Sequence, residues 1–176
     1  MKKQLIDRSL VNDKIWSNTY EALRKLVDNS YYSQLAMPPP VKYTIKAYLK
    51  EFCTIRMTTS RQSGHTTAVC KLAHEYFDSA ILMSPTYEMS KRFCQFLRHV
   101  IPDSEITKIT KSELATNNGG YYFGSYKSID RFRGISCEAV IIDGTFDLTP
   151  KKEDELYTVL EPCMSRWHQK FFIFVQ

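Results

Sequence analysis

Residues 59–67 read T-S-R-Q-S-G-H-T-T and have the length and composition of a phosphate-binding loop. Such a loop follows the pattern G-x-x-x-x-G-K-[ST], in which backbone amides surround the phosphates, the lysine contacts the β- and γ-phosphate oxygens, and the hydroxyl binds magnesium. Gly64 and Thr66 stand in the expected places, but Thr59 replaces the first glycine and His65 replaces the lysine. A glycine followed by polar residues is also an ordinary strand-to-helix connection, so the loop needs support from its surroundings.

A second motif lies at residues 139–143, which read A-V-I-I-D. An acid at the end of a buried strand can hold the magnesium ion of a bound nucleotide, although Asp143 is equally compatible with a turn or a cap. A strand and a helix, residues 79–100, lie between the two motifs, as expected where a further strand separates them in the sheet. The ordered pair predicts a nucleotide-binding fold.

Strand patterns alternate with helix patterns around these motifs, which predicts an α/β domain with a mainly parallel sheet covered on both faces. We expect residues 54–58 and 139–142 to be interior strands, because they are apolar and β-branched. The predicted strands are residues 53–58, 79–84, 121–123, 139–142 and 171–175, the predicted helices are residues 65–77, 86–100 and 153–160, and residues 117–120 are a turn signal.

The first 40 residues have a different pattern. Residues 12–29 carry apolar side chains at three- and four-residue steps, which predicts an amphipathic helix. Three prolines at positions 38–40 then interrupt the chain, and a helical period resumes from residue 41. We therefore predict an N-terminal helical arm over residues 1–40 and a core domain over residues 41–176.

Composition limits the class of protein. A chain of 176 residues with 43% hydrophobic content is most simply one domain with a sizeable core, and a net charge of +5 permits contact with nucleic acid without demanding it. The five cysteines are odd in number and never spaced C-x-x-C, so they predict neither a disulfide framework nor a zinc site. No segment has the roughly 18 apolar residues of a membrane span, so we expect a cytoplasmic protein without a membrane partner.

At these motifs the chain resembles a known family. Residues 60–67, S-R-Q-S-G-H-T-T, resemble the S-R-Q-x-G-K-T-T loop of the large terminase subunits of tailed phages, the ATPases that drive DNA into the capsid. The resemblance continues through M-S-P-T at 83–86, N-G-G-Y-Y-F-G-S at 118–125, and R-G at 133–134 followed by V-I-I-D at 140–143. It covers residues 45–175, the ATPase half, and leaves no room for a nuclease domain.

The resemblance implies a three-layer P-loop NTPase fold of the RecA-like ASCE type, encoded by a phage and working in the host cytoplasm. It implies that Thr66 and Asp143 hold the metal ion. Arg61 is either the displaced basic residue that some terminases place early in the loop or the family's ordinary loop arginine. The implied nucleotide-binding residues are Arg61, Gln62, Ser63, Gly64, His65, Thr66 and Thr67.

The sequence departs from the family at three places. A neutral histidine at position 65 brings little charge to the phosphates near pH 7, so binding should weaken. Gly144 stands where the family has the glutamate that activates the attacking water, which removes the general base from its expected place. The third departure is the end of the chain, where terminases continue into a segment that couples hydrolysis to movement.

No catalytic residue can therefore be assigned, and whether ATP is hydrolysed stays open. Asp147 or Glu138 could replace the glutamate, but each is also typical of a solvated surface charge. Arg131 and Arg133 lie where an arginine finger or sensor could act. The alternative is that they are solvated or DNA-facing residues of a basic loop. Basic residues interleaved with aromatic ones fit a nucleic-acid surface or the wet faces of amphipathic helices: Lys42, Lys46, Lys50, Lys91, Arg92 and Arg98 with Tyr43, Tyr48 and Phe93.

Two function hypotheses follow. The first is a terminase-like ATPase domain that binds ATP and Mg²⁺, associates with DNA, and hydrolyses weakly or not at all. The second is a non-catalytic derivative of the same fold that binds DNA or another phage or host protein. Self-association is a further expected contact of the chain.

Overall fold

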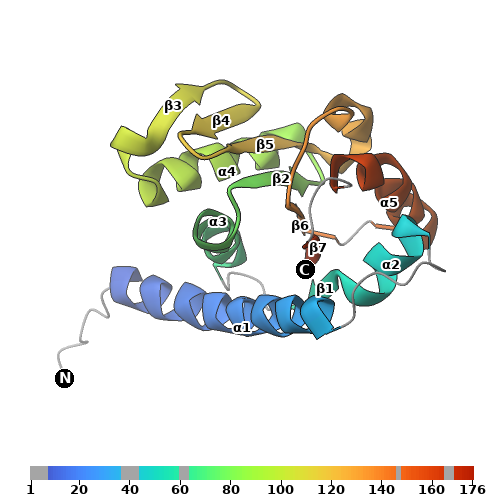
Figure 1. Cartoon of the computed structure of the whole chain (residues 1–176). Helices are drawn as coiled ribbons and strands as arrows, with labels where there is room; N and C mark the ends of the chain where they lie inside the picture. Colours follow the sequence, from blue (N-terminus) through green and yellow to red (C-terminus); the bar gives the residue numbers. More distant parts are fainter. Residues whose placement is uncertain (1–7, 37–43, 60–63, 146–147, 165–168) are drawn as a thin grey trace.

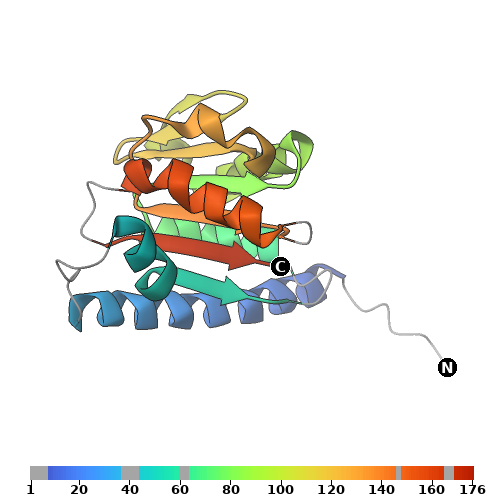
Figure 2. The same cartoon turned by 90° about the vertical axis from the view of Figure 1, so that its right-hand side faces the viewer.

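The computed structural model of the chain describes residues 8–36, 44–59, 64–145, 148–164 and 169–176. Within these ranges a single seven-stranded sheet forms the middle layer, with helices on both of its faces (Figures 1 and 2). The first five strands in spatial order pair in parallel, and the last two join antiparallel. This confirms the predicted α/β class and mainly parallel sheet. The spatial order is β1 (Thr54–Met57), β7 (Phe171–Val175), β6 (Ala139–Asp143), β2 (Ser79–Ser84), β5 (Gly120–Ser125), β4 (Glu113–Thr116) and β3 (Ile106–Ile109).

Helices divide between the two faces of the sheet. One face carries α3 (His65–Tyr76) and α4 (Tyr87–Val100), with the long helix α1 (Arg8–Ala36) packed against α3. The other face carries α2 (Ile45–Phe52), α5 (Pro150–Met164) and the 3₁₀ segment η2 (Tyr126–Phe132). A short 3₁₀ turn, η1 (Asp103–Glu105), precedes β3.

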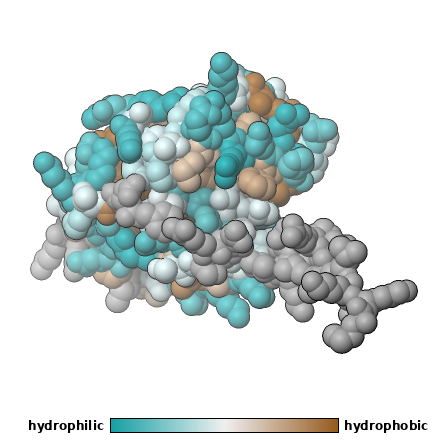
Figure 3. All heavy atoms as spheres, turned by 180° about the vertical axis from the view of Figure 1, so that it is seen from behind, coloured by the Kyte–Doolittle hydropathy of each residue, from teal (hydrophilic) through white to brown (hydrophobic). Residues whose placement is uncertain are grey.

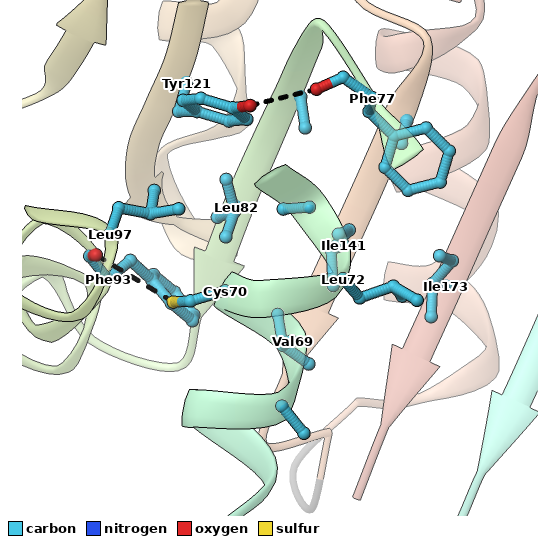
Figure 4. Packing of buried hydrophobic residues seen from close by; sticks show 14 of the residues in the cluster. Val69, Cys70, Leu72, Phe77, Leu82, Phe93, Leu97, Tyr121, Ile141 and Ile173 are labelled. Carbon is cyan, nitrogen blue, oxygen red and sulfur yellow. Dashed lines mark hydrogen bonds between the residues drawn. The ribbon is translucent and has the colours of Figure 1, made fainter. Parts of the chain in front are cut away.

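Each face has its own hydrophobic core, because successive side chains of a strand point to opposite sides. In β6, Ala139 and Ile141 belong to the core under α3, whereas Val140 and Ile142 belong to the core under α5. Figure 4 shows the first of these cores, where Leu72 of α3 lies against the strands. The alternating apolar strands therefore fix both helical layers on the sheet.

The N-terminal helix α1 is part of this packing. Its residues Tyr20, Leu23 and Val27 are buried at 6%, 0% and 1% exposure in the core under α3. At its far end Gln34 donates to the Lys170 carbonyl at 2.8 Å and accepts from the Lys170 amide at 3.0 Å. The predicted helix of residues 12–29 is thus real and longer, whereas the proline run at 38–40 lies outside the described residues.

Two expectations about the sheet were wrong. In the described part of the chain β1 pairs only with β7, so it is an edge strand, and its burial is partial where β6 and β7 are fully buried. Exposed Arg56 on β1 is a residue type that edge strands tolerate. The strand that separates β1 from β6 is β7, not the strand at residues 79–84.

The β3–β4 hairpin is an element that the sequence patterns did not predict. It extends the sheet antiparallel beyond β5, and the turn at Asn117 and Asn118 connects β4 to β5, as the turn signal indicated. No helix within the described ranges has the length and apolar character that a membrane span requires.

Candidate nucleotide site

The register of the sheet brings the two sequence motifs to one edge. Met57, the last residue of β1, and Asp143, the last residue of β6, both align with Val175 of the intervening strand β7. With neighbouring strands about 4.8 Å apart, the ends of β1 and β6 lie on the order of 10 Å from each other. The loop that leaves β1 and the carboxylate that ends β6 therefore share the carboxyl edge of the sheet.

Gly64 sets the start of α3. It is the N-cap residue with φ +66° and ψ 23°, a left-handed conformation that glycine adopts without strain. A Cβ at this position would lie 2.6 Å from Trp16 Cβ of α1, so a side chain has no room. Glycine therefore allows α3 to begin close against α1. The first N–H groups of an α-helix have no acceptor within the helix itself.

Asp143 is held by two residues of that first turn. The Thr66 hydroxyl donates to Asp143 Oδ2 at 2.7 Å, and His65 Nε2 lies 3.0 Å from Asp143 Oδ1. Asp143 is only 5% exposed, so its charge lies in a partly desolvated place. The end of β6 and the start of α3 thus form one polar cluster of hydroxyl, imidazole and carboxylate.

The electrostatics of the cluster favour a charged imidazole. Its polar contact with the Asp143 carboxylate raises the pKa of His65, an effect that burial of the ring partly opposes. Protonated His65 would bring a positive charge to the N-terminus of α3, where the helix dipole already favours anions. A protonated His65 would therefore supply positive charge at the position where the resembling family has a lysine.

A pocket of about 780 Å³ opens over this cluster. Three groups of residues line it: the start of α3, the ends of β1, β2, β6 and β7, and one side of α4. Met89 and Phe96 give the α4 wall apolar surface, whereas Arg92 and Gln95 add polar groups. The full lining among described residues is Thr59, Gly64, His65, Thr66, Thr67, Ser84, Met89, Arg92, Gln95, Phe96, Asp143, Gly144 and Gln176.

Figure 3 shows the face of the molecule toward which β1 and β7 point in Figure 2. On this face most of the described surface is hydrophilic, and the hydrophobic spheres gather on the side that carries α4 and the β3–β4 hairpin. The apolar wall of the pocket therefore belongs to the more hydrophobic side of a mainly polar face.

Several lining residues were missed or interpreted differently from the sequence. Arg92 was predicted only as a surface or nucleic-acid residue, yet it lines the pocket. Gln176 was considered only as the end of the chain, yet its carbonyl accepts from the Thr59 amide at 2.6 Å and from the Thr59 hydroxyl at 2.9 Å. The sequence did contain a signal for Arg92. It predicted a helix directly after the strand at residues 79–84, and such a helix begins at the carboxyl edge of the sheet.

Some predicted site residues do not meet at this pocket. Glu138 precedes β6 and so lies about 17 Å of strand away from Asp143, where its carboxylate accepts from the Asp78 amide at 2.7 Å. Arg133 pairs with Asp130 at 2.9 Å. Arg131 lies over the ring of Tyr87, with its guanidinium carbon 5.6 Å from the centroid. Four further predicted residues, Arg61, Gln62, Ser63 and Asp147, lie outside the described residues.

The basic and aromatic residues predicted as a nucleic-acid surface are dispersed. Lys46 and Lys50 both contact Asp154, at 2.6 Å and 2.5 Å, on the α2 and α5 side. Lys91 lies over Tyr87, 5.2 Å from the ring centroid, on the α4 side. Lys42 and Tyr43 lie outside the described residues. The cations that the sequence grouped together therefore belong to at least two separate faces.

Gly144 follows Asp143 with φ +80°, a conformation that side chains rarely adopt. A Cβ there would lie 3.2 Å from Pro85 Cδ and 3.9 Å from Met89 Cε. Its amide donates to the Val175 carbonyl at 2.9 Å, which fixes the turn that leaves β6. At the position where the resembling family carries a glutamate, both the backbone conformation and the contact with Pro85 therefore favour glycine in this chain.

Comparison with solved structures supports the fold. The ATPase domain of the large terminase of Thermus phage P74-26 aligns with a TM-score of 0.50 and 14% identity, over 83% of this chain and 67% of that one. A point mutant of that domain gives a TM-score of 0.49 at 14% identity, over 83% and 68% of the two chains. The large terminase of another thermophilic bacteriophage, in complex with ADP, gives 0.45 at 12% identity, over 74% and 37%.

No protein-family model matches the chain, and no curated protein does either. At 14% identity, the first of these structural similarities shows the fold alone. That fold is the P-loop type of α/β domain that the sequence motifs predicted, and it is similar to the ATPase domain of a phage terminase.

Proposed function

We propose that this chain is a terminase-like ATPase domain that binds ATP together with Mg²⁺ at the pocket over α3, and that it hydrolyses ATP weakly or not at all. The observation that carries the proposal is the 2.7 Å contact between Thr66 and Asp143 at the N-terminus of α3, inside a pocket of about 780 Å³. A hydroxyl, a carboxylate and a helix N-terminus in one pocket are the groups that a magnesium nucleotide requires.

The phosphates would lie against the first turn of α3. Its amides have no intrahelical acceptors, and the positive end of the helix dipole favours an anion. His65 and Arg92 line the same pocket and can supply positive charge. The guanidinium of Arg92 offers several donors to phosphate oxygens, so it can compensate in part for the absence of a lysine at position 65.

The metal ion would lie between Thr66 and Asp143. Their oxygens are the hard ligands that Mg²⁺ prefers, and Mg²⁺ usually keeps several waters and the phosphate oxygens as its other ligands. The bound ion would neutralise phosphate charge, while Thr66 and Asp143 would hold and orient it. The direct hydrogen bond between the two residues already places both oxygens at one point, so the site needs no large rearrangement.

The α4 wall gives the nucleoside part of the ligand a place to bind. Met89 and Phe96 present apolar side chains along the pocket, and Gln95 between them carries an amide that can both donate and accept hydrogen bonds. Pockets for cofactors combine such apolar walls with a few polar groups. We infer that the base packs on Phe96 and Met89 while the phosphates contact α3.

Weak or absent hydrolysis follows from the lack of a second carboxylate to act as general base, because His65 is engaged by Asp143. Among the described residues that line the pocket, Asp143 is the only acid, and the proposed metal site already uses it. Gln176 can orient a water molecule through its amide but cannot accept its proton. Without a positioned general base, a hydrolase loses a factor of about 10²–10⁴ in rate.

DNA association is the second part of the proposal. Lys91 and Arg131 both lie near the ring of Tyr87, with their charged groups 5.2 Å and 5.6 Å from its centroid. A cation-flanked aromatic ring at the surface can contact phosphates and stack on a base. Because Tyr87 begins α4, this contact would lie on the helix that also walls the nucleotide pocket.

A non-catalytic binding module is the second candidate function, and one observation favours it. Thr66 and His65 already contact one carboxylate oxygen of Asp143 each, at 2.7 Å and 3.0 Å, so protein groups occupy the place proposed for the metal ion. In this case the P-loop fold would serve as a scaffold for DNA, for another phage protein or for a second copy of the chain.

Titration calorimetry with ATP and Mg²⁺ on the full chain distinguishes the two functions. The first predicts binding in the micromolar to millimolar range that Asp143→Asn weakens at least tenfold in the presence of Mg²⁺, with a smaller change in EDTA. Asp130→Asn, an exposed acid in η2, is the matched control and should leave affinity unchanged. Absence of heat at millimolar ATP, from a folded protein, would favour the binding module.

A further inference from the structure

A second, smaller pocket lies at the opposite end of the sheet. It has a volume of about 250 Å³ and is lined by the end of α1, the end of α3 and the segments that lead into β6 and β7. Because those strands begin here, this pocket lies a full strand length away from Asp143 and takes no part in the proposed nucleotide site. Its lining residues are Asp28, Tyr31, Tyr32, Tyr76, Phe77, Glu138, Gln169 and Phe171.

Aromatic rings form most of its wall. Tyr31 and Tyr32 meet edge to face, with centroids 5.6 Å apart and planes at 88°. Phe77 contacts Phe171 at 5.1 Å and Tyr76 at 6.3 Å between centroids. Five rings from three separate segments therefore surround one small space, and each ring face carries the negative part of its quadrupole.

Two carboxylates complete the pocket. Asp28 accepts a hydrogen bond from the Tyr76 hydroxyl at 3.0 Å, and Glu138 accepts from the Asp78 amide at 2.7 Å. Neither forms an ion pair with any residue that the structure describes, and the nearby Arg24 is paired with Glu21 at 2.9 Å. Among the described residues, both acids are thus held in place by neutral donors and neither is in an ion pair, although Arg24 is close enough to Asp28 for their charges to attract.

The protonation behaviour of Glu138 agrees with an unneutralised charge. Burial raises the pKa of Glu138, and the neighbouring carboxylate of Asp78 raises it further, whereas the hydrogen bonds from backbone amides lower it. The positive charge of a cation in the pocket would offset both unfavourable effects.

We propose that this pocket binds the guanidinium group of an arginine side chain on a partner protein. Rings and carboxylates that converge on one space are the groups that recognise an organic cation, and arginine combines a flat, stackable cation with donors for carboxylates. At about 250 Å³ the pocket is smaller than the roughly 300–1,000 Å³ of typical small-molecule sites, which suits a single side chain.

Exposed apolar and aromatic side chains at the edge of the pocket indicate that the cation belongs to a partner protein. Tyr32 and Leu35 are 68% and 58% exposed on the last turns of α1, and Tyr31 is 39% exposed. Tyrosines at the surface beside a charged pocket are typical of interface residues, which surround an arginine anchor in many complexes. The pocket would therefore receive the arginine while the exposed end of α1 contacts the apolar neighbours of that arginine.

The test compares two peptides on the full chain. Acetyl-leucyl-arginyl-leucine amide should bind in the millimolar range or tighter, seen as shifts in the tyrosine ring signals by NMR. The same peptide with citrulline, the neutral isostere of arginine, should bind about tenfold more weakly, because the charge is lost at constant shape. Equal binding of the two peptides, or no binding of either, would overturn the proposal.

Variants locate the binding. Glu138→Gln keeps an acceptor for the Asp78 amide and should weaken the arginine peptide about tenfold, and Tyr32→Ala, at a largely exposed position, should weaken it several-fold without unfolding the chain. Glu51→Gln, an exposed acid on α2, is the control and should change nothing. Arginine amide that binds as tightly as the tripeptide would contradict the protein partner and indicate a free small cation instead.

Discussion

Thr66 and Asp143 are 77 residues apart in the chain and are joined by a hydrogen bond of 2.7 Å. Thr66 stands in the first turn of α3, and Asp143 ends β6, so the bond ties the helix start to the carboxyl edge of the sheet. His65 contacts the other carboxylate oxygen at 3.0 Å. One carboxylate therefore organises both the residue that would bind metal and the residue that replaces the loop lysine, and substitutions at these positions have separable consequences.

Restoring lysine should strengthen nucleotide binding. His65→Lys places a permanent charge at the first residue of α3, where it can reach the β- and γ-phosphates. A charge-assisted hydrogen bond contributes about 1.5–3 kcal/mol, so ATP affinity should rise roughly ten- to a hundredfold in calorimetry. His99→Lys, the same change at an exposed position late in α4, should have no such effect.

Affinity that stays the same in folded His65→Lys would contradict the view that this loop still binds phosphate. A gain of equal size in His99→Lys would mean that added charge attracts nucleotide without a defined site. Melting temperatures of both variants, measured without ligand, show whether each protein is folded.

The pKa of His65 gives a pH prediction for the protein in EDTA. The contact with Asp143 raises this pKa in the folded state above the ordinary value near 6.5. The stabilisation is therefore fully present below pH 6.5 and is lost as pH rises through the folded-state pKa. The melting temperature of the native chain should exceed that of His65→Gln most near pH 6, and the difference should narrow toward pH 8.5.

Asp143→Asn provides the control for this titration. Without the carboxylate, the pKa of His65 measured by NMR should fall, and the pH-dependent part of the difference should shrink. A difference between native chain and His65→Gln that is constant from pH 6 to 8.5 would show that the His65 contact does not depend on charge.

Local patterns predicted most of the elements and the meeting of the two motifs. The apolar runs that became β2, β6 and β7 are fully buried, and a fully buried strand has a clear sequence pattern. The strands β3 and β4 were missed because most of their residues are exposed or half-buried, so they have no continuous apolar run. The order of the strands depends on pairing between distant segments, which no local pattern contains, and so β1 was wrongly expected in the interior.

The sequence predicted the motif residues of the candidate site, but not the other residues that line the pocket. Gly64, Thr66 and Asp143 belong to motifs, and a parallel sheet must bring its strand ends to one edge. Arg92 and Gln176 have no motif, and they reach the pocket only because α4 passes beside that edge and β7 lies between β1 and β6. The positive φ of Gly144 could not be predicted from the sequence either, because glycine occurs in many backbone conformations.

The packing of α1 predicts a large difference between two leucines of one helix. Leu23 is fully buried under α3, whereas Leu26 is 37% exposed. Leu23→Ala should lower the free energy of unfolding by about 2–5 kcal/mol in urea, because it leaves a cavity in the core. Leu26→Ala should cost substantially less. Equal small effects of the two changes would contradict the integration of α1 into the core.

Gly144 provides the last prediction, which concerns the missing glutamate. The resemblance to terminases suggests that Gly144→Glu would restore hydrolysis, but the structure argues against it. A non-glycine residue at φ +80° costs about 1–2 kcal/mol, and its Cβ would press on Pro85 at 3.2 Å. Gly144→Glu should therefore lower the melting temperature by several degrees. It should also leave ATP hydrolysis at the parent's level, alone or combined with His65→Lys.

Gly134→Glu is the matched control, because Gly134 also has a positive φ, +85°, but no atom lies within 4 Å of its added Cβ. The smaller loss of stability expected there would separate the contact with Pro85 from the backbone strain. Magnesium-dependent hydrolysis well above the parent in Gly144→Glu, with unchanged melting, would show that the turn after Asp143 accepts a catalytic glutamate after all.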